Sequence, residues 1–185
     1  REVDLAGAAA LRFIGGGSFS HSPFLARLRL PPGVALGQSC FRRCLALQEL
    51  DLSAAVVPEG GVVTDVDDPP EDPEEWMYQL HAMGHDEGLL SGCEALARVA
   101  LPASLRHTGR YFLYGCSALT NVDLAHTVIT TLAPHAFESC LTLRTVTLPP
   151  TVTTVCDSVF SGCRELRSID LSESTGLTHI GRGFA

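Results

Sequence analysis

A cysteine recurs along the chain in a fixed frame of apolar residues. In each copy the cysteine is followed by apolar residues three, six and eight positions later, as in Cys116, Leu119, Val122 and Leu124. The last copies are about 23 residues apart. A repeat of this length predicts a solenoid, because one unit buries its apolar face only against its neighbours. The frame begins at Ser22, Cys44, Cys93, Cys116, Cys140 and Cys163.

Each copy also contains a short segment in which polar and apolar residues alternate, such as RTVTL at 144–148. A period of two predicts a strand with one buried face, and with a shortened copy at 3–5 the chain has seven such strand cores. Proline has no N–H to donate to a neighbouring strand, so it marks the end of a strand. Three of the seven strand cores end in this way, at Pro31, Pro102 and Pro149. A second apolar stretch and a turn complete each unit, so we expect the strands to form one parallel sheet along one face.

The clearest copy, residues 143–163, reads LRTVTLPPTVTTVCDSVFSGC, and Phe137 precedes Cys140 at the same spacing as the phenylalanine in this copy. The pattern resembles the BspA-like class of leucine-rich repeats, which occurs in surface and secreted proteins of bacteria and protozoa. The resemblance implies an α/β leucine-rich-repeat solenoid of mostly short parallel strands, turns and short helical pieces, wound as a single curved right-handed coil. It also implies a scaffold with many uses, a cell-surface adhesin or coat protein among them.

Length and charge narrow the classes of function. The 185 residues, 45% of them apolar, suffice for one domain over 1–185, and no apolar run is long enough to cross a membrane. Both ends fall inside a repeat, so we expect this chain to be a fragment of a longer protein. The net charge of −8 is concentrated in residues 57–88, and the remainder has no dominant basic patch, which argues against nucleic-acid binding.

The recurring cysteines are predicted to line up as a buried structural column. Side chains that stack in one direction do not converge as a disulfide requires, and no C-x-x-C pair is present for zinc. We therefore expect small thiols that pack and donate weak hydrogen bonds to turn carbonyls. Cys40 and Cys156 lie outside the column, and a disulfide at either is an open alternative. An odd number of mostly buried thiols slightly favours the cytoplasm, with the cell surface as the alternative.

Between Cys44 and Cys93 the chain is about 26 residues longer than one repeat requires. We interpret residues 57–88 as an acidic insertion and not as a degenerate repeat, because the cysteine frame is missing there. Asp72 as N-cap and Pro73 as the first helical residue predict a helix at about 73–83. An apolar stripe on this helix either covers the solenoid wall or docks a partner, and it consists of Trp76, Met77, Leu80 and Met83.

No metal, cofactor or catalytic site is predicted. The acidic run at 65–68 lacks the residue order of an EF-hand loop, and Gly84 interrupts the helix between His81 and His85, which have the spacing of a helical zinc pair. The chain contains no G-x-S-x-G, H-E-x-x-H or P-loop motif. We therefore expect a protein that is not an enzyme, with the regulatory repeat domain of a larger enzyme as an alternative.

The strand residues that point away from the core form two outward columns, and solenoids use such a face for binding. In the first half of the chain these columns alternate in charge from unit to unit, and we expect them to select another protein as the partner. The alternative is that they only keep the sheet soluble. The predicted partner-binding residues are the charged patch Arg27, Arg29, Glu49, Asp51 and Arg98, and beyond it Asn121, Asp123 and Asp170.

Overall fold

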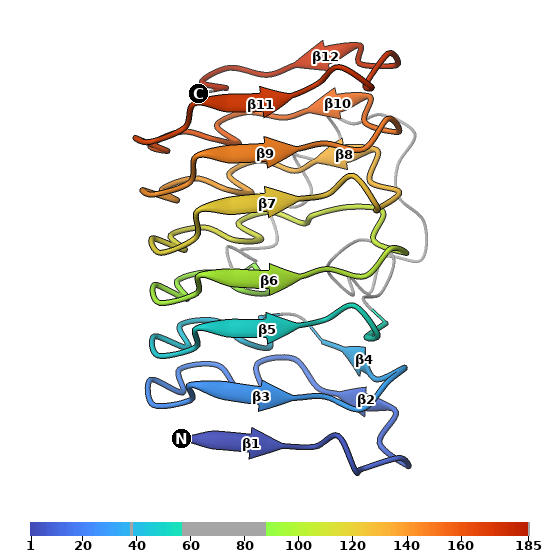
Figure 1. Cartoon of the computed structure of the whole chain (residues 1–185), viewed down its shortest axis with the longest axis vertical. Helices are drawn as coiled ribbons and strands as arrows, with labels where there is room; N and C mark the ends of the chain where they lie inside the picture. Colours follow the sequence, from blue (N-terminus) through green and yellow to red (C-terminus); the bar gives the residue numbers. More distant parts are fainter. Residues whose placement is uncertain (38, 57–87, 185) are drawn as a thin grey trace.

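The computed structural model describes residues 1–37, 39–56 and 88–184, which form a stack of similar coils (Figure 1). Each coil contributes a three-residue strand to one side of the stack, which we call the strand face. These strands are β1 (Glu2–Asp4), β3 (Arg27–Arg29), β5 (Glu49–Asp51), β6 (Arg98–Ala100), β7 (Asn121–Asp123), β9 (Thr145–Thr147) and β11 (Ser168–Asp170). Shorter strands form a second wall: β2 (Phe13–Ile14), β4 (Ala35–Leu36), β8 (Thr131–Leu132), β10 (Thr154–Val155) and β12 (His179–Ile180). The predicted parallel-strand solenoid is confirmed.

On the strand face, paired strands run parallel and in register. The central residue of a strand points into the core and its two neighbours point out: in β5, Leu50 is buried, whereas Glu49 and Asp51 are exposed. The ladder is divided into the pieces β1–β3, β5–β6 and β7–β9–β11 and is not one continuous sheet. Outward residues nevertheless form columns along the stack, because the coils follow one another in the same orientation (Figure 1).

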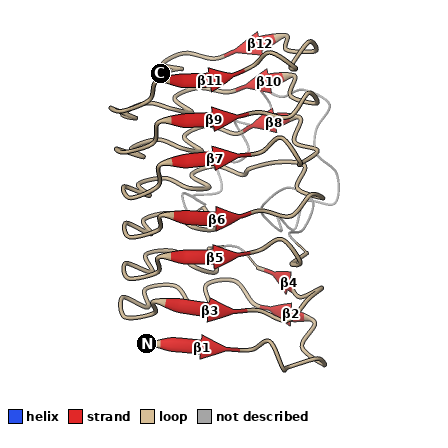
Figure 2. Cartoon of the chain, viewed as in Figure 1, coloured by secondary structure: helices blue, strands red, loops and turns tan. Residues whose placement is uncertain are grey.

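The segment before each cysteine position is a tight turn, and these turns together form what we call the turn wall. Its N–H groups donate to the next unit, as Phe137 N does to Val159 O at 2.9 Å. The expectation of short helical pieces, and with it the α/β class, is wrong: the described residues form strands and turns but no helix (Figure 2). A left-handed residue stands directly before each cysteine position and interrupts any right-handed helix. These residues are His21, Arg43, Gly92, Gly115, Ser139 and Gly162.

The stack continues from β5 to β6 although residues 52–97 separate these two strands in the sequence. β5 pairs directly with β6, with Glu49 opposite Arg98 and Leu50 opposite Val99. On the turn wall, Phe41 N donates to the Leu89 carbonyl at 3.1 Å, which repeats the bond found between the other units. No further strand therefore stands between β5 and β6 on the strand face. The predicted helix at about 73–83 lies outside the described residues, as does the proposed insertion up to residue 87.

Large apolar side chains three residues before the cysteine positions form the centre of the core. Phe137 and Phe160 are fully buried, and their rings stack at 5.4 Å between centroids with 12° between planes. Phe19 and Phe41 stack in the same way at 5.8 Å and 12°. Buried leucines occupy this position in the two units between these pairs. Each unit thus buries its apolar face against the next, as the repeat predicts.

Candidate functional site

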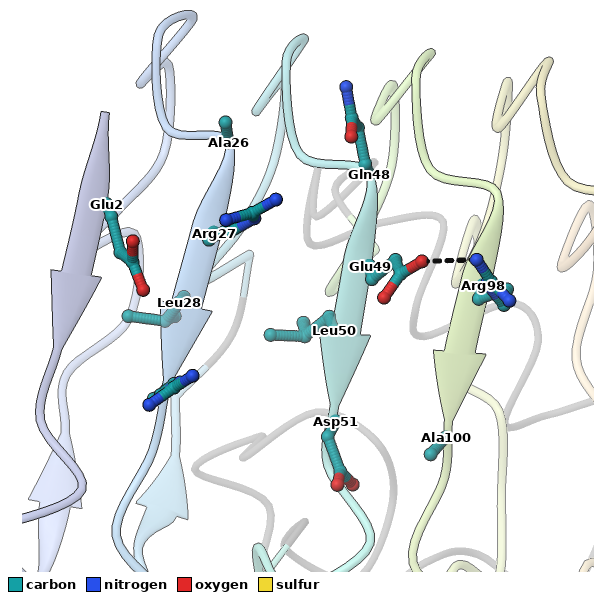
Figure 3. Close-up of a pocket in the computed structure, with 11 residues that line it drawn as sticks. Glu2, Ala26, Arg27, Leu28, Gln48, Glu49, Leu50, Asp51, Arg98 and Ala100 are labelled. Atoms are coloured by element: carbon teal, nitrogen blue, oxygen red, sulfur yellow. Dashed lines mark ion pairs between the residues drawn. The ribbon is translucent and has the colours of Figure 1, made fainter.

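The strand face contains a hollow of about 480 Å³ over β1, β3, β5 and β6 (Figure 3). All five residues of the predicted charged patch line this hollow. The sequence places these residues on one face but does not indicate the hollow itself. The lining residues are Glu2, Ala26, Arg27, Leu28, Arg29, Gln48, Glu49, Leu50, Asp51, Arg98 and Ala100. Residues 52–97 separate β5 from β6 in the sequence, so the direct β5–β6 pairing is what joins these two strands of the surface.

The outward charges of the four strands are arranged as stripes that follow the strands, and all of them except Asp4 line the hollow. Within one strand, outward residues are two positions apart and have the same sign: two acids on β1, two arginines on β3 and two acids on β5. β6 contributes Arg98, and the second outward residue of this strand is the uncharged Ala100. Adjacent strands in a sheet are about 4.8 Å apart. A partner therefore meets alternating negative and positive stripes, at about that spacing within the pairs β1–β3 and β5–β6.

Two ion pairs link neighbouring stripes. Arg98 Nη2 lies 2.6 Å from Glu49 Oε1, and Arg29 Nη1 lies 3.6 Å from Asp4 Oδ2. The side chains of the first pair are 80% and 61% exposed, and exposed pairs of this kind contribute about 0–1 kcal/mol each. These pairs orient the side chains but hold them only weakly. A binding partner can therefore replace either contact at a small cost in free energy.

Arg27 differs from the other two arginines of the hollow. Its guanidinium points from β3 toward β5 (Figure 3). Within the described part of the chain its side chain forms no ion pair, although Glu2 is its register partner on β1. A guanidinium presents five N–H donors in a planar fork that suits a carboxylate. Arg27 is therefore the cation of this surface that is best placed to contact an acidic group of a partner.

Aspartates at the ends of four strand-face strands also close the turns that follow. Asp51 Oδ1 accepts hydrogen bonds from the Ser53 hydroxyl at 2.6 Å and the Ser53 N–H at 2.9 Å. These two bonds hold the pKa of Asp51 below its usual value. The equivalent N–H bonds are Ala6 to Asp4 at 2.9 Å, Ala125 to Asp123 at 3.0 Å and Ser172 to Asp170 at 3.0 Å. Asp51 thus has a structural role in addition to lining the hollow.

Aspartate and proline alternate at these strand exits from one unit to the next. In the three units that lack the aspartate, the residue two positions later is Pro31, Pro102 or Pro149. Proline has no N–H for a carboxylate to accept, so an aspartate has no turn to close there. Neither sequence-based interpretation of the outward columns, recognition of a partner or solubility of the sheet, includes this role. The signal is visible in the sequence as D-L-[AS] in alternation with x-L-P.

The remaining predicted partner-binding residues lie further along the strand face. Asn121 and Asp123 are on β7, and Asp170 is on β11, so none of them lines the hollow. Asn121 Oδ1 accepts a hydrogen bond from the Thr145 hydroxyl of β9 at 2.6 Å. The structure therefore brings together the five residues of the charged patch and leaves these three apart from it.

The recurring cysteines form a repeated hydrogen-bond pattern along the core. Each thiol donates to a backbone carbonyl of the preceding unit. The acceptor residue stands three positions before the cysteine position of that unit. In the first complete unit Ser22 stands at the position that cysteine occupies in the later units. The thiol–carbonyl distances are Cys44 to Phe19 3.1 Å, Cys93 to Phe41 3.0 Å, Cys116 to Leu90 3.4 Å, Cys140 to Leu113 3.2 Å and Cys163 to Phe137 3.1 Å.

Burial makes one thiol of the column, and both cysteines outside it, poor nucleophiles. It raises the pKa of Cys116 to about 12, and the pKa of Cys40 and of Cys156 to about 11. A reactive cysteine requires the opposite, a thiolate stabilised in an electropositive and accessible setting. All seven cysteines have free thiols in this structure. The column therefore acts through packing and hydrogen bonding.

The described residues contain no cluster of metal ligands and no membrane-spanning helix. Over residues 1–37, 39–56 and 88–184, no group of three or more His, Cys, Asp or Glu side chains is placed to hold a metal ion. The same residues include no helix that is long and apolar enough to cross a membrane. The apolar stripe at 76–83, the acidic run at 65–68 and the His81–His85 pair lie outside the described residues.

Comparison with known proteins relates this architecture to repeat proteins of bacteria. The family model for BspA-type leucine-rich repeat regions matches residues 4–58 and 86–184 in six copies. A leucine-rich repeat protein from Eubacterium ventriosum is 24% identical with a TM-score of 0.71, over 99% of this chain and 41% of its own. The T. pallidum leucine-rich repeat protein is 22% identical with a TM-score of 0.58, over 93% of this chain and 66% of its own.

A leucine-rich repeat protein from Bacteroides ovatus is 20% identical with a TM-score of 0.62, and the alignment covers 97% of this chain and 44% of that one. The chain thus spans less than two thirds of the length of each of these proteins. No curated protein matches the sequence. At these identities the likeness concerns the fold alone.

Proposed function

The chain belongs to the family of BspA-type leucine-rich repeat proteins, and we propose that it is a non-catalytic scaffold that binds another protein through its strand face. One observation carries this proposal: the charged residues predicted for recognition line a single hollow, which spans the paired strands β1–β3 and β5–β6. Leucine-rich repeats in general present such extended surfaces to partners.

The structure of the hollow suits selection of a partner more than chemistry on a small molecule. Its charged side chains are exposed and stand on short strands that hydrogen bonds hold in register. Complementary charges across an interface mainly determine which partner binds and how fast it associates. The buried cysteine column takes no part, because its thiols are already bonded to carbonyls.

The proposal is tested by reversing the charge of the β3 stripe. The variant Arg27→Glu/Arg29→Glu is compared with Arg164→Glu/Arg182→Glu, which reverses two exposed arginines outside the hollow. Captured proteins are identified by crosslinking and mass spectrometry with wild type and both variants as bait. We expect the β3 variant to lose its specific partner roughly tenfold or more in affinity, since like charges in contact oppose binding, while the control retains it. Equal capture by both variants would exclude the strand face as the binding surface.

A further inference from the structure

The order of the charged stripes in the hollow identifies a partner. Along the stack, β1, β3, β5 and β6 present negative, positive, negative and positive charge. Read from the opposite end, the same four strands present positive, negative, positive and negative charge. The surface is therefore complementary to its own reversed copy. We infer that the strand face binds a second copy of this chain. This inference rests on the proposed function and names the partner.

The symmetry of the contact follows from this order. A twofold axis parallel to the strands and midway between β3 and β5 turns one strand face onto the other and reverses the stack. It places β3 over β5 of the partner subunit, and β1 over its β6. Residues at the same position within their strands then face one another, as in an isologous contact. Arg27 faces Glu49 of the partner subunit, Arg29 faces Asp51 of the partner subunit, and Glu2 faces Arg98 of the partner subunit.

The other way to oppose two strand faces is electrostatically unfavourable. A twofold axis along the stack would place each strand over its own copy, so that Arg27 and Arg29 would face the same two arginines. Like charges in direct opposition select against an arrangement. The stripe order therefore selects one orientation of the strands, and the axis between β3 and β5 is the register that joins the most opposite charges.

The state of the individual side chains agrees with this contact. Glu2, Arg27, Arg29, Glu49, Asp51 and Arg98 are all exposed. Arg27 forms no ion pair with any residue that the structure describes, so it gives up no existing contact when it meets Glu49 of the partner subunit. Glu49 already pairs with Arg98 at 2.6 Å, and in the dimer it would lie between two guanidinium groups.

The size of the surface determines how strong this association is. Only four strands of three residues each take part, so we expect a contact smaller than the roughly 800 Å² per partner of a stable interface. Exposed ion pairs contribute little each and are screened by salt. We therefore expect a reversible dimer that is populated at high protein concentration and low ionic strength, and that dissociates as salt is added.

Two single variants that complement each other test this inference. Arg27→Glu alone puts a carboxylate opposite Glu49 of the partner subunit, and Glu49→Arg alone puts a guanidinium opposite Arg27 of the partner subunit. When the two variants are mixed, both contacts again join opposite charges. By analytical ultracentrifugation at low salt, we expect each variant alone to dimerise roughly tenfold or more weakly than wild type, and their equimolar mixture to recover most of the wild-type dimer. Arg182→Glu serves as control and should dimerise like wild type.

A wild-type protein that stays monomeric at near-millimolar concentration and low salt would overturn the inference, and so would a mixture that stays monomeric. Neither result would overturn the proposed function if Arg27→Glu/Arg29→Glu still loses a captured partner. Wild-type dimerisation by both single variants would also exclude this contact. Recovery in the mixture also shows that both variants are folded, because a misfolded chain cannot supply the complementary face.

Discussion

Replacing Phe137 with alanine is expected to lower the free energy of unfolding by about 3–5 kcal/mol, the usual cost of removing a buried ring. Phe137 is fully buried and stacks on Phe160 at 5.4 Å. Its carbonyl also accepts the Cys163 thiol at 3.1 Å. In a solenoid each unit is stabilised mainly by its neighbours, so a cavity here weakens two interfaces between units. Chemical denaturation followed by circular dichroism measures the loss.

Two further variants separate the packing effect from a general effect of losing an aromatic ring. Phe137→Leu should cost less than about 1.5 kcal/mol, because Leu90 and Leu113 fill the equivalent position in neighbouring units. Phe24→Ala should change stability little, since Phe24 is 68% exposed. If Phe137→Ala and Phe24→Ala unfold at the same denaturant concentration, the column of large apolar residues does not stabilise the stack.

Gly37→Ala is expected to destabilise the protein by roughly 1–3 kcal/mol or more, the cost of forcing added atoms into a packed site. A Cβ at Gly37 would lie 2.3 Å from Gly16 N and 2.7 Å from Gly15 C. Both are backbone atoms of the preceding unit, so a side-chain rotation cannot relieve the contact. The change also disturbs the bond from Gly37 N to Ile14 O at 2.8 Å.

The matched control for this substitution is Gly7→Ala. A Cβ at Gly7 would meet no atom within 4 Å, and alanine restricts the unfolded chain more than glycine does. We expect Gly7→Ala to leave stability unchanged or slightly raised in the same denaturation experiment. Equal stability of the two alanine variants would contradict the close approach of successive units at Gly37.

The sequence predicts the fold well where the repeat stays in phase. All seven expected strand cores form strands of the strand face, and their central residues, such as Val122 and Val146, point into the core. The cysteine frame locates these strands because each unit must present the same apolar pattern to its neighbours. The same periodicity identifies the outward residues, so the charged patch follows from it as well.

The turn wall is less predictable, because its hydrogen bonds join different units. A run such as PHAFESC at 134–140 contains residues that suit a short helix. Left-handed φ values at His135 and Ser139, 59° and 61°, instead direct the N–H groups to the next unit. Non-glycine residues adopt this conformation rarely, so the sequence favours a helix that the stacked units replace.

The hollow also depends on information beyond any single repeat. Its charged stripes come from four units, and two of these units, with β5 and β6, are separated in the sequence by residues 52–97. Whether β5 meets β6 or another strand decides if Glu49 and Arg98 are neighbours. Periodicity places each of them on the outer face but does not specify that contact, which comes from the pairing of the two strands.

The contact between β5 and β6 is therefore the feature on which both binding proposals depend. Nuclear Overhauser spectroscopy on isotopically labelled protein measures it directly through cross-strand contacts between Leu50 and Val99. The in-register stack predicts these contacts, along with contacts between the flanking pair Glu49 and Arg98. Cross-strand contacts from β5 to any segment other than β3 and β6 would contradict it.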